Sequence, residues 1–142
     1  MNQPVELPDV HERISGFAYS GFQRNQDPTE QLYPSTSELN SDLALLGREA
    51  EAIRTYSSTD NANVPRLASD HGLLVTAGAW IDRRSAHNDD EIAALIRSVR
   101  ENSNIERVIV GNEAILRGDI SVADLIKKIK QVKRKVRVPV ST

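Results

Sequence analysis

Short apolar runs alternate with longer amphipathic segments along this chain of 142 residues, and this alternation limits the folds that it can adopt. Five short runs are predicted to be β-strands, at residues 13–20, 52–58, 73–82, 105–113 and 136–142. Strands and helices in this rhythm form a parallel sheet, because a parallel neighbour is reached only through a crossover segment. The sequence therefore predicts an α/β protein with the order β-α-β-α-β-α-β-α-β.

Four segments between these strands carry the signals of helices, at residues 35–51, 63–72, 88–103 and 121–135. Three of them open on a capping residue with an acid three positions later: Ser35 with Glu38, Asn88 with Glu91, and Ser121 with Asp124. In the remaining segment, Pro65 is allowed in the first turn and Gly72 is a stop signal. Each segment is thus predicted to be a helix that begins at its capping residue.

Two architectures share this element order: a flavodoxin-like open sheet, and a (β/α)8 TIM barrel interrupted part-way. The last predicted strand reaches Thr142 without the helix that would cover the edge of an open five-stranded sheet. A complete barrel needs about 250 residues. We therefore expect residues 1–142 to be a single α/β unit, a truncated (β/α)8 domain with open sheet edges through which the chain self-associates.

The composition excludes several classes of function. With no cysteine, and with three histidines that lack ligand spacing, neither a thiolate site nor a metal site is predicted. No phosphate-binding fingerprint is present, so no cofactor is expected. The net charge of −2 and the absence of aromatics in the basic run 127–137 argue against nucleic acid as a partner, and that run is interpreted as a solvated helix face. No membrane segment or signal peptide is recognised in this chain.

Polar and aromatic residues close the predicted strands, and parallel strands deliver their carboxyl ends to one face. The residues in question are Tyr19, Arg54, Tyr56, Trp80, Asn112 and Glu113. Aromatic rings stack on the apolar faces of sugars, while Arg and Asn bind ring hydroxyls. A carboxyl group such as that of Glu113 can protonate a glycosidic oxygen. The long polar connection 21–34 is expected on the same face.

The segments "GFAYSGFQRNQDP", "AIRTYSS", "LLVTAGAWID" and "VIVGNEAILRGD" together resemble the N-terminal half of glycoside hydrolase family 17, in its proteobacterial branch of β-1,3-glucan hydrolases and transglycosylases. The resemblance implies that Glu113 is the catalytic acid/base, and that Asn112, Tyr19, Arg54, Tyr56 and Trp80 bind substrate. It also suggests the cell envelope or periplasm as the location.

The same resemblance places the nucleophile, a Glu, on a strand beyond Thr142, because a retaining glycosidase needs two carboxylates. Asp82 is the nearest candidate in this chain, and we expect it to serve the following loop instead. Two functions remain open from the sequence. The first is half of a retaining β-1,3-glucan hydrolase or glucosyltransferase, inactive by itself, whose partner is a β-glucan oligosaccharide or polysaccharide. The second is a non-catalytic α/β module that binds glucan or a partner protein.

Overall fold

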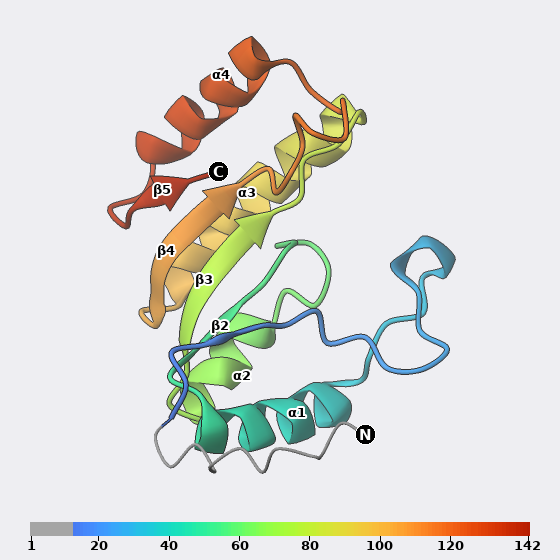
Figure 1. The fold of residues 1–142 in the computed structure, drawn as a ribbon, viewed down its shortest axis with the longest axis vertical. Coiled ribbons are helices and arrows are strands. Elements are labelled where there is room, and N and C mark those ends of the chain that lie inside the picture. The colour runs from blue at the N-terminus through green and yellow to red at the C-terminus, as the bar shows by residue number, and fades with distance from the viewer. Residues whose placement is uncertain (1–12) are drawn as a thin grey trace, which may run out of the picture.

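Residues 13–142 are described by a computed structural model, drawn as a ribbon in Figure 1. Its strands are β1 (Phe17–Ala18), β2 (Ala52–Arg54), β3 (Leu74–Ala79), β4 (Ile105–Val110) and β5 (Val140–Ser141). Its helices are α1 (Thr36–Glu49), α2 (Val64–Asp70), α3 (Ser85–Glu101) and α4 (Val122–Lys133), with a short 3-10 helix η1 (Pro28–Glu30) between β1 and α1. The predicted alternation of strands and helices is confirmed.

The sheet is parallel throughout and has the strand order β1-β2-β3-β4-β5. This order confirms the predicted parallel α/β fold and is consistent with part of a (β/α)8 barrel, whereas a flavodoxin-like sheet has the order 2-1-3-4-5. The longest pairing joins β3 to β4 and ends where Ala79 lies beside Val110. The sheet is not closed, because β1 and β5 are each paired on one side only.

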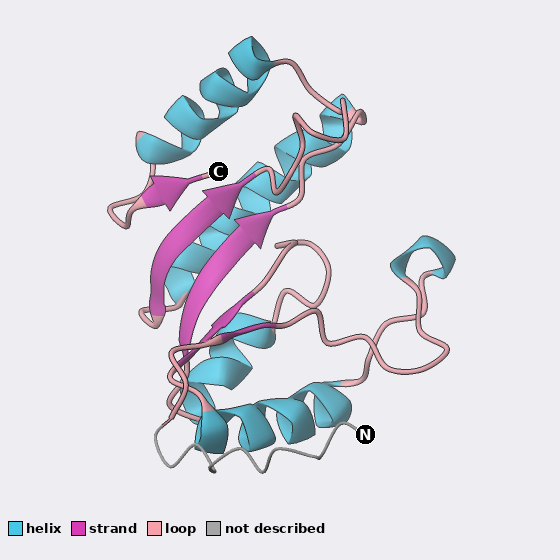
Figure 2. Cartoon of the chain, viewed as in Figure 1, coloured by secondary structure: helices cyan, strands magenta, loops and turns pink. Residues whose placement is uncertain are grey.

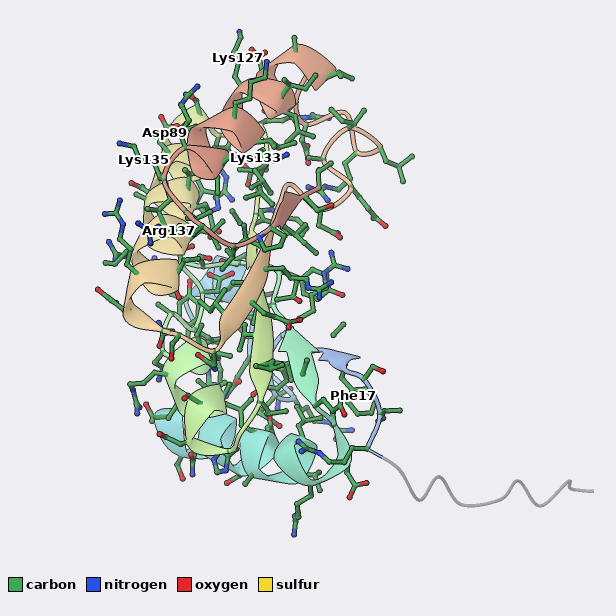
Figure 3. The ribbon with its side chains drawn as sticks, turned by 90° about the vertical axis from the view of Figure 1, so that its left-hand side faces the viewer. Phe17, Asp89, Lys127, Lys133, Lys135 and Arg137 are labelled. Carbon is green, nitrogen blue, oxygen red and sulfur yellow. The ribbon has the colours of Figure 1, made fainter. Side chains whose placement is uncertain are left out.

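Helices α1 to α4 lie on one side of the sheet, as Figure 2 and Figure 3 show. The hydrophobic core fills the space between them. Ile53 of β2, Val75 of β3 and Val108 of β4 are at most 1% exposed, as are Leu43 of α1 and Leu95 of α3. Alternate residues of each strand therefore pack under the helices, which leaves the remaining residues on the opposite face.

The opposite face and the sheet edge are less well covered. Leu74 of β3 is 43% exposed and Phe17 of the edge strand β1 is 40% exposed. Figure 3 shows that the labelled Lys127 and Lys133 lie at α4, in the upper half of the view, away from Phe17. Lys127, Lys130 and Lys133 are exposed on α4, in agreement with a solvated helix face, whereas Lys135 and Arg137 follow the end of the helix at Lys133.

Of the three predicted caps with an acid three positions later, two are correct and one is wrong. Ser35 caps α1 in a full capping box with Glu38, and Ser121 caps α4. In contrast, α3 begins at Ser85, three residues before the predicted Asn88. Asn88 is buried inside the helix, where its amide binds the main chain of Asp82 through both its oxygen and its nitrogen.

No helix within residues 13–142 is long and apolar enough to cross a membrane.

The strands are shorter than the sequence predicts, and β4 is the clearest case. It ends at Val110, whereas the apolar pattern suggested a strand that reaches Glu113. Gly111 and Glu113 both adopt left-handed backbone conformations, with φ of +81° and +51°, which no strand can accommodate. The positive φ favours glycine at position 111, where a Cβ would also lie 2.9 Å from a terminal methyl group of Leu125 of α4. Asn112 and Glu113 therefore lie on a turn that begins directly after the strand.

Candidate active site

The carboxyl ends of β2, β3 and β4 lie along one edge of the sheet and carry most of the predicted site residues. Arg54 is the last residue of β2, Trp80 follows β3 directly, and Asn112 follows β4 after one glycine. Arg54 of β2 pairs with Thr76 of β3 in the sheet register. The side chains of Thr76 and Leu74 lie on the same face of the sheet, and the buried Val75 lies on the other face. The Arg54 side chain therefore projects on the face that the helices do not cover.

Arg54 reaches over β3 and joins the ends of two strands that are not neighbours. Its Nη2 donates a hydrogen bond of 2.5 Å to Oδ1 of Asn112. Its guanidinium carbon lies 5.0 Å from the centre of the Tyr56 ring, within the range of a cation–π contact. The Nε of Arg54 is buried and has no hydrogen-bond partner among the described residues. A buried donor without a partner costs free energy.

Glu113 is exposed and lies on the turn after β4. Its backbone oxygen accepts a hydrogen bond of 2.9 Å from the amide of Arg117. Within residues 13–142, its carboxylate makes no hydrogen bond or ion pair. The catalytic role that the family resemblance implies for Glu113 stays a prediction.

Arg117 is a site residue that the sequence analysis missed. Its guanidinium donates to the backbone oxygens of Asn112 and Ile81, at 2.5 and 3.0 Å, and pairs with Asp119 at 2.8 Å. Its central carbon also lies 4.2 Å from the centre of the Trp80 ring. One arginine therefore connects the turn after β4 to the turn after β3. Its position in "ILRGD", four residues after Glu113 of the Asn-Glu pair, was the available signal.

Trp80 and Tyr56 line a groove of about 760 Å³ together with Tyr33 of the β1–α1 connection. Pro28 and Thr29 of η1 line the same groove, as do Asp60 and His87. Aromatic side chains from three separate segments thus converge on one hollow, beside polar groups that can bind hydroxyls. This is the composition of a carbohydrate-binding cleft, and the polar connection 21–34 contributes to it as expected.

The Tyr19 hydroxyl points toward Asp42 of α1. Tyr19 is 9% exposed, and its hydroxyl lies 3.2 Å from Oδ2 of Asp42 on α1, to which it donates. Burial, followed by the charge and hydrogen bond of Asp42, raises the pKa of the Tyr19 phenol well above its usual value. The ring of Tyr19 lines a small pocket with Tyr56, but its hydroxyl is not joined to the Arg54–Asn112 pair.

The other carboxylates near the groove have different environments. Burial, followed by the charge of Glu91, raises the pKa of Asp60. The hydrogen bond from Arg84 is the main cause that lowers the pKa of Asp82, and the two residues form an ion pair of 2.5 Å. The Asp82 carboxylate therefore binds Arg84 of the following loop, as expected. In the described part of the chain, no group of three or more histidine and acidic side chains is arranged to hold a metal ion.

Glu91 is the second residue that the sequence analysis placed incorrectly. It was predicted to close a capping box at the start of a helix, but it lies inside α3 and is fully buried. Its carboxylate accepts hydrogen bonds from Ser57, Ser58 and Thr59 after β2, and from the amide of Trp80 after β3. The signal was available, since Glu91 shares a helix face with the apolar Leu95.

Comparisons with known proteins identify the family. The model of the BtgE/BtgC glycoside hydrolase domain matches residues 16–142. A "probable glucan endo-1,3-beta-glucosidase" of Aspergillus flavus is 27% identical, over 86% of this chain and 19% of the relative. A glucan 1,3-beta-glucosidase of Arthroderma benhamiae is 28% identical, over 69% of this chain and 33% of the relative. One of Candida albicans is 29% identical, over 71% and 34%.

The chain thus spans between a fifth and a third of the length of these curated relatives. No solved structure matches it. The three relatives are fungal, and the expected position in a proteobacterial branch stays a prediction. Because the family model covers nearly all of the described residues, and because the relatives agree with it, the chain belongs to the BtgE/BtgC glycoside hydrolase domain family, a domain of the glycoside hydrolase family 17 type.

Proposed function

We propose that this chain is one part of a (β/α)8 domain that cleaves or rearranges β-1,3-glucan as a retaining glycosidase or glucosyltransferase. Membership of the family supports a glycoside hydrolase, and the names of the relatives support β-1,3-glucan as the substrate. The open parallel sheet with helices on one side supports a position within a barrel. Hydrolysis and transfer share the same first step and differ in the acceptor.

The hydrogen bond between Arg54 and Asn112 is the observation that carries this proposal. It holds a carboxamide at the strand ends, directly before Glu113, and the Arg54 guanidinium that donates to it lies over the Tyr56 ring. In the proposed mechanism, Glu113 protonates the glycosidic oxygen and later activates the acceptor, which is water or a second glucan. Asn112 and Arg54 bind hydroxyls of the reacting sugar.

The aromatic side chains bind the sugar rings through their faces. Trp80 and Tyr56 line the groove beside the Arg54–Asn112 pair, and Tyr19 borders the subsite from the pocket that it shares with Tyr56. A retaining mechanism needs a second carboxylate about 5 to 5.5 Å from the first. We propose that this nucleophile is a Glu that the chain does not contain, so the isolated chain should bind glucan without hydrolysing it.

Glu113→Gln in the complete protein tests the catalytic role. The variant should lose about 10² to 10⁴-fold in turnover of β-1,3-glucan, the usual contribution of a general acid. Release of phenolate from an activated aryl glucoside should persist in the first turnover, because such a leaving group needs no proton. Glu101→Gln, at the exposed end of α3, is the matched control and should leave both rates unchanged.

Two outcomes would redirect the proposal. Equal loss of both reactions in Glu113→Gln would show that Glu113 is not the acid. Glucan binding by the complete protein with no turnover of either substrate would instead support the non-catalytic glucan-binding module.

We also propose that the isolated chain self-associates. The free edges of β1 and β5, with Phe17 and Leu74 exposed, can pair with a second copy of the chain. Sedimentation velocity of the isolated chain should therefore show a concentration-dependent dimer or larger species. A single monomeric boundary across the concentration range would contradict it.

A further inference from the structure

Glu91 of α3 is a fully buried carboxylate, and three of the four residues that donate hydrogen bonds to it, Ser57, Thr59 and Trp80, line the groove. One of its oxygens, Oε1, accepts from the Ser57 hydroxyl at 2.6 Å, from the amide of Thr59 at 3.2 Å and from the Thr59 hydroxyl. The other, Oε2, accepts from the amides of Ser58 and Trp80, each at 2.9 Å. One side chain therefore joins a helix to the segments that follow two different strands.

The two segments that Glu91 joins are opposite parts of the candidate sugar site. Ser57 and Thr59 line the groove and lie directly after Tyr56, while Trp80 supplies the indole. Neither segment has regular secondary structure where it meets Glu91, because β2 ends at Arg54 and β3 ends at Ala79. The carboxylate thus stabilises a stretch of loop that strand pairing does not hold.

Burial of a charge here is not explained by packing alone. A buried carboxylate costs several kcal/mol unless hydrogen bonds or an ion pair compensate it. Within residues 13–142, Glu91 has no basic side chain as an ion-pair partner, and donors from residues 57–59 and 80 supply the compensation. An apolar residue of the same size would fill the space at lower cost. The Ser58 hydroxyl also donates to the backbone oxygen of Gly78 at 2.7 Å, and the carboxylate adds the acceptors that fix the amides of Ser58 and Trp80 relative to each other.

We propose that Glu91 is a positioning residue that sets the distance between Tyr56 and Trp80, and through it the width of the sugar-binding groove. The inference rests on the proposed function, because it assigns the groove to a β-1,3-glucan chain. Glu91 itself touches no substrate in this scheme. It acts through the amides of Ser58 and Trp80.

Glu91→Leu and Glu91→Gln separate positioning from stability. Leucine fills the space but accepts no hydrogen bond, so the amides of Ser58 and Trp80 both lose their acceptor. Glutamine can keep its oxygen on those two amides while its NH₂ donates to the hydroxyls of Ser57 and Thr59. The Thr59 amide then loses the Glu91 oxygen but keeps a second acceptor, the Ser57 hydroxyl at 3.2 Å. Glutamine should therefore rescue the position of Trp80, and leucine should not.

Asn104→Ala is the matched control for a buried polar contact far from the groove. The Asn104 amide donates to the backbone oxygens of Pro65 and Leu73, at 2.9 and 3.0 Å, near the amino ends of β3 and β4. The variant loses two hydrogen bonds but leaves the groove walls unchanged.

Two measurements on the isolated chain decide the proposal. Amide hydrogen exchange by NMR should show that Glu91→Leu speeds exchange at Ser58 and Trp80 by about tenfold or more, relative to other buried amides of β3. Glu91→Gln should leave exchange at Ser58 and Trp80 close to that of the wild type, because the glutamine oxygen can accept from both amides. Binding of a β-1,3-glucan oligosaccharide, followed through the fluorescence of the only tryptophan, should weaken by about tenfold in Glu91→Leu and little in Glu91→Gln or Asn104→Ala.

Each result has one interpretation. Unchanged exchange at Trp80 in Glu91→Leu would overturn the proposal, as would equal loss of binding in Asn104→Ala. If Glu91→Leu does not fold, exchange in Glu91→Gln decides: protection kept at Ser58 and Trp80 supports the positioning role, and loss of protection at both amides overturns it. If the wild-type chain binds no oligosaccharide, the proposed function fails, while the exchange data still test the role of Glu91.

Discussion

Arg54→Met should have a small effect on stability and a large effect on glucan binding. The substitution removes the hydrogen bond from a charged donor to Asn112, worth about 1.5 to 3 kcal/mol. It also removes the cation–π contact with Tyr56, worth about 0.5 to 1 kcal/mol. Both losses destabilise the folded state.

The buried Nε of Arg54 acts in the opposite direction. It has no partner among the described residues, and a buried unsatisfied donor costs about 1 to 3 kcal/mol. Methionine removes this cost and keeps most of the apolar stem. The terms leave a net destabilisation of about 1 kcal/mol, or roughly 3 °C in Tm for a chain of this size.

The assay is urea unfolding followed through Trp80 fluorescence, together with titration of a β-1,3-glucan oligosaccharide. Binding should fall by at least about tenfold, because a ligand oxygen loses a charged donor. Arg66→Met is the control, since Arg66 is exposed on α2 and, among residues 13–142, pairs only with Asp70, at 3.2 Å. It should change stability by less than about 1 kcal/mol and leave binding unchanged. A stability loss above about 4 kcal/mol in Arg54→Met would refute the reasoning about Nε, and unchanged binding would refute the role in the site.

Three further predictions concern stability. The pKa of the Tyr19 phenol is raised in the folded state, so its protonated form contributes stability below pH 10. This stability is lost as the pH rises above 10 toward the folded-state pKa. Urea unfolding at about pH 9 and about pH 11 should therefore show a smaller alkaline loss of stability in Tyr19→Phe than in the wild type. Ser35→Ala should cost about 1 kcal/mol in thermal unfolding because it removes the α1 cap, whereas Ser37→Ala in the same helix should be nearly neutral. Gly78→Ala should destabilise by about 1 to 3 kcal/mol, because its Cβ would lie 2.7 Å from the backbone oxygen of Tyr56; native stability in this variant would show that the loop after β2 moves freely.

Local signals in the sequence account for the parts of the fold that were predicted correctly. The caps at Ser35 and Ser121 involve residues three positions apart, so their effect is visible without the fold. The apolar runs identified every strand, and the alternation with helices determined that the sheet is parallel. Arg54, Tyr56, Trp80 and Asn112 were predicted to converge for the same reason, since parallel strands end at one edge.

Long-range contacts decided the rest. Asn88 and Glu91 have the spacing of a helix start, but the structure buries both because their partners lie on other segments, near Asp82, Ser58 and Trp80. A pattern of residue types along the sequence cannot reveal a hydrogen bond to a backbone group 33 residues away. The direction of the Tyr19 hydroxyl has the same origin, because Asp42 reaches it only when α1 packs on the sheet.

The amino-acid sequence by itself thus determined the order, the parallel direction and the common edge of the strands, because these follow from periodicity and from the geometry of crossovers. The tertiary structure alone decided which groups meet at that edge. The pairing of Arg54 with Asn112, the stacking of Arg117 on Trp80 and the burial of Glu91 all depend on side chains that reach between elements. Such contacts depend on the packing of the whole sheet and its helices, so no local pattern in the chain encodes them.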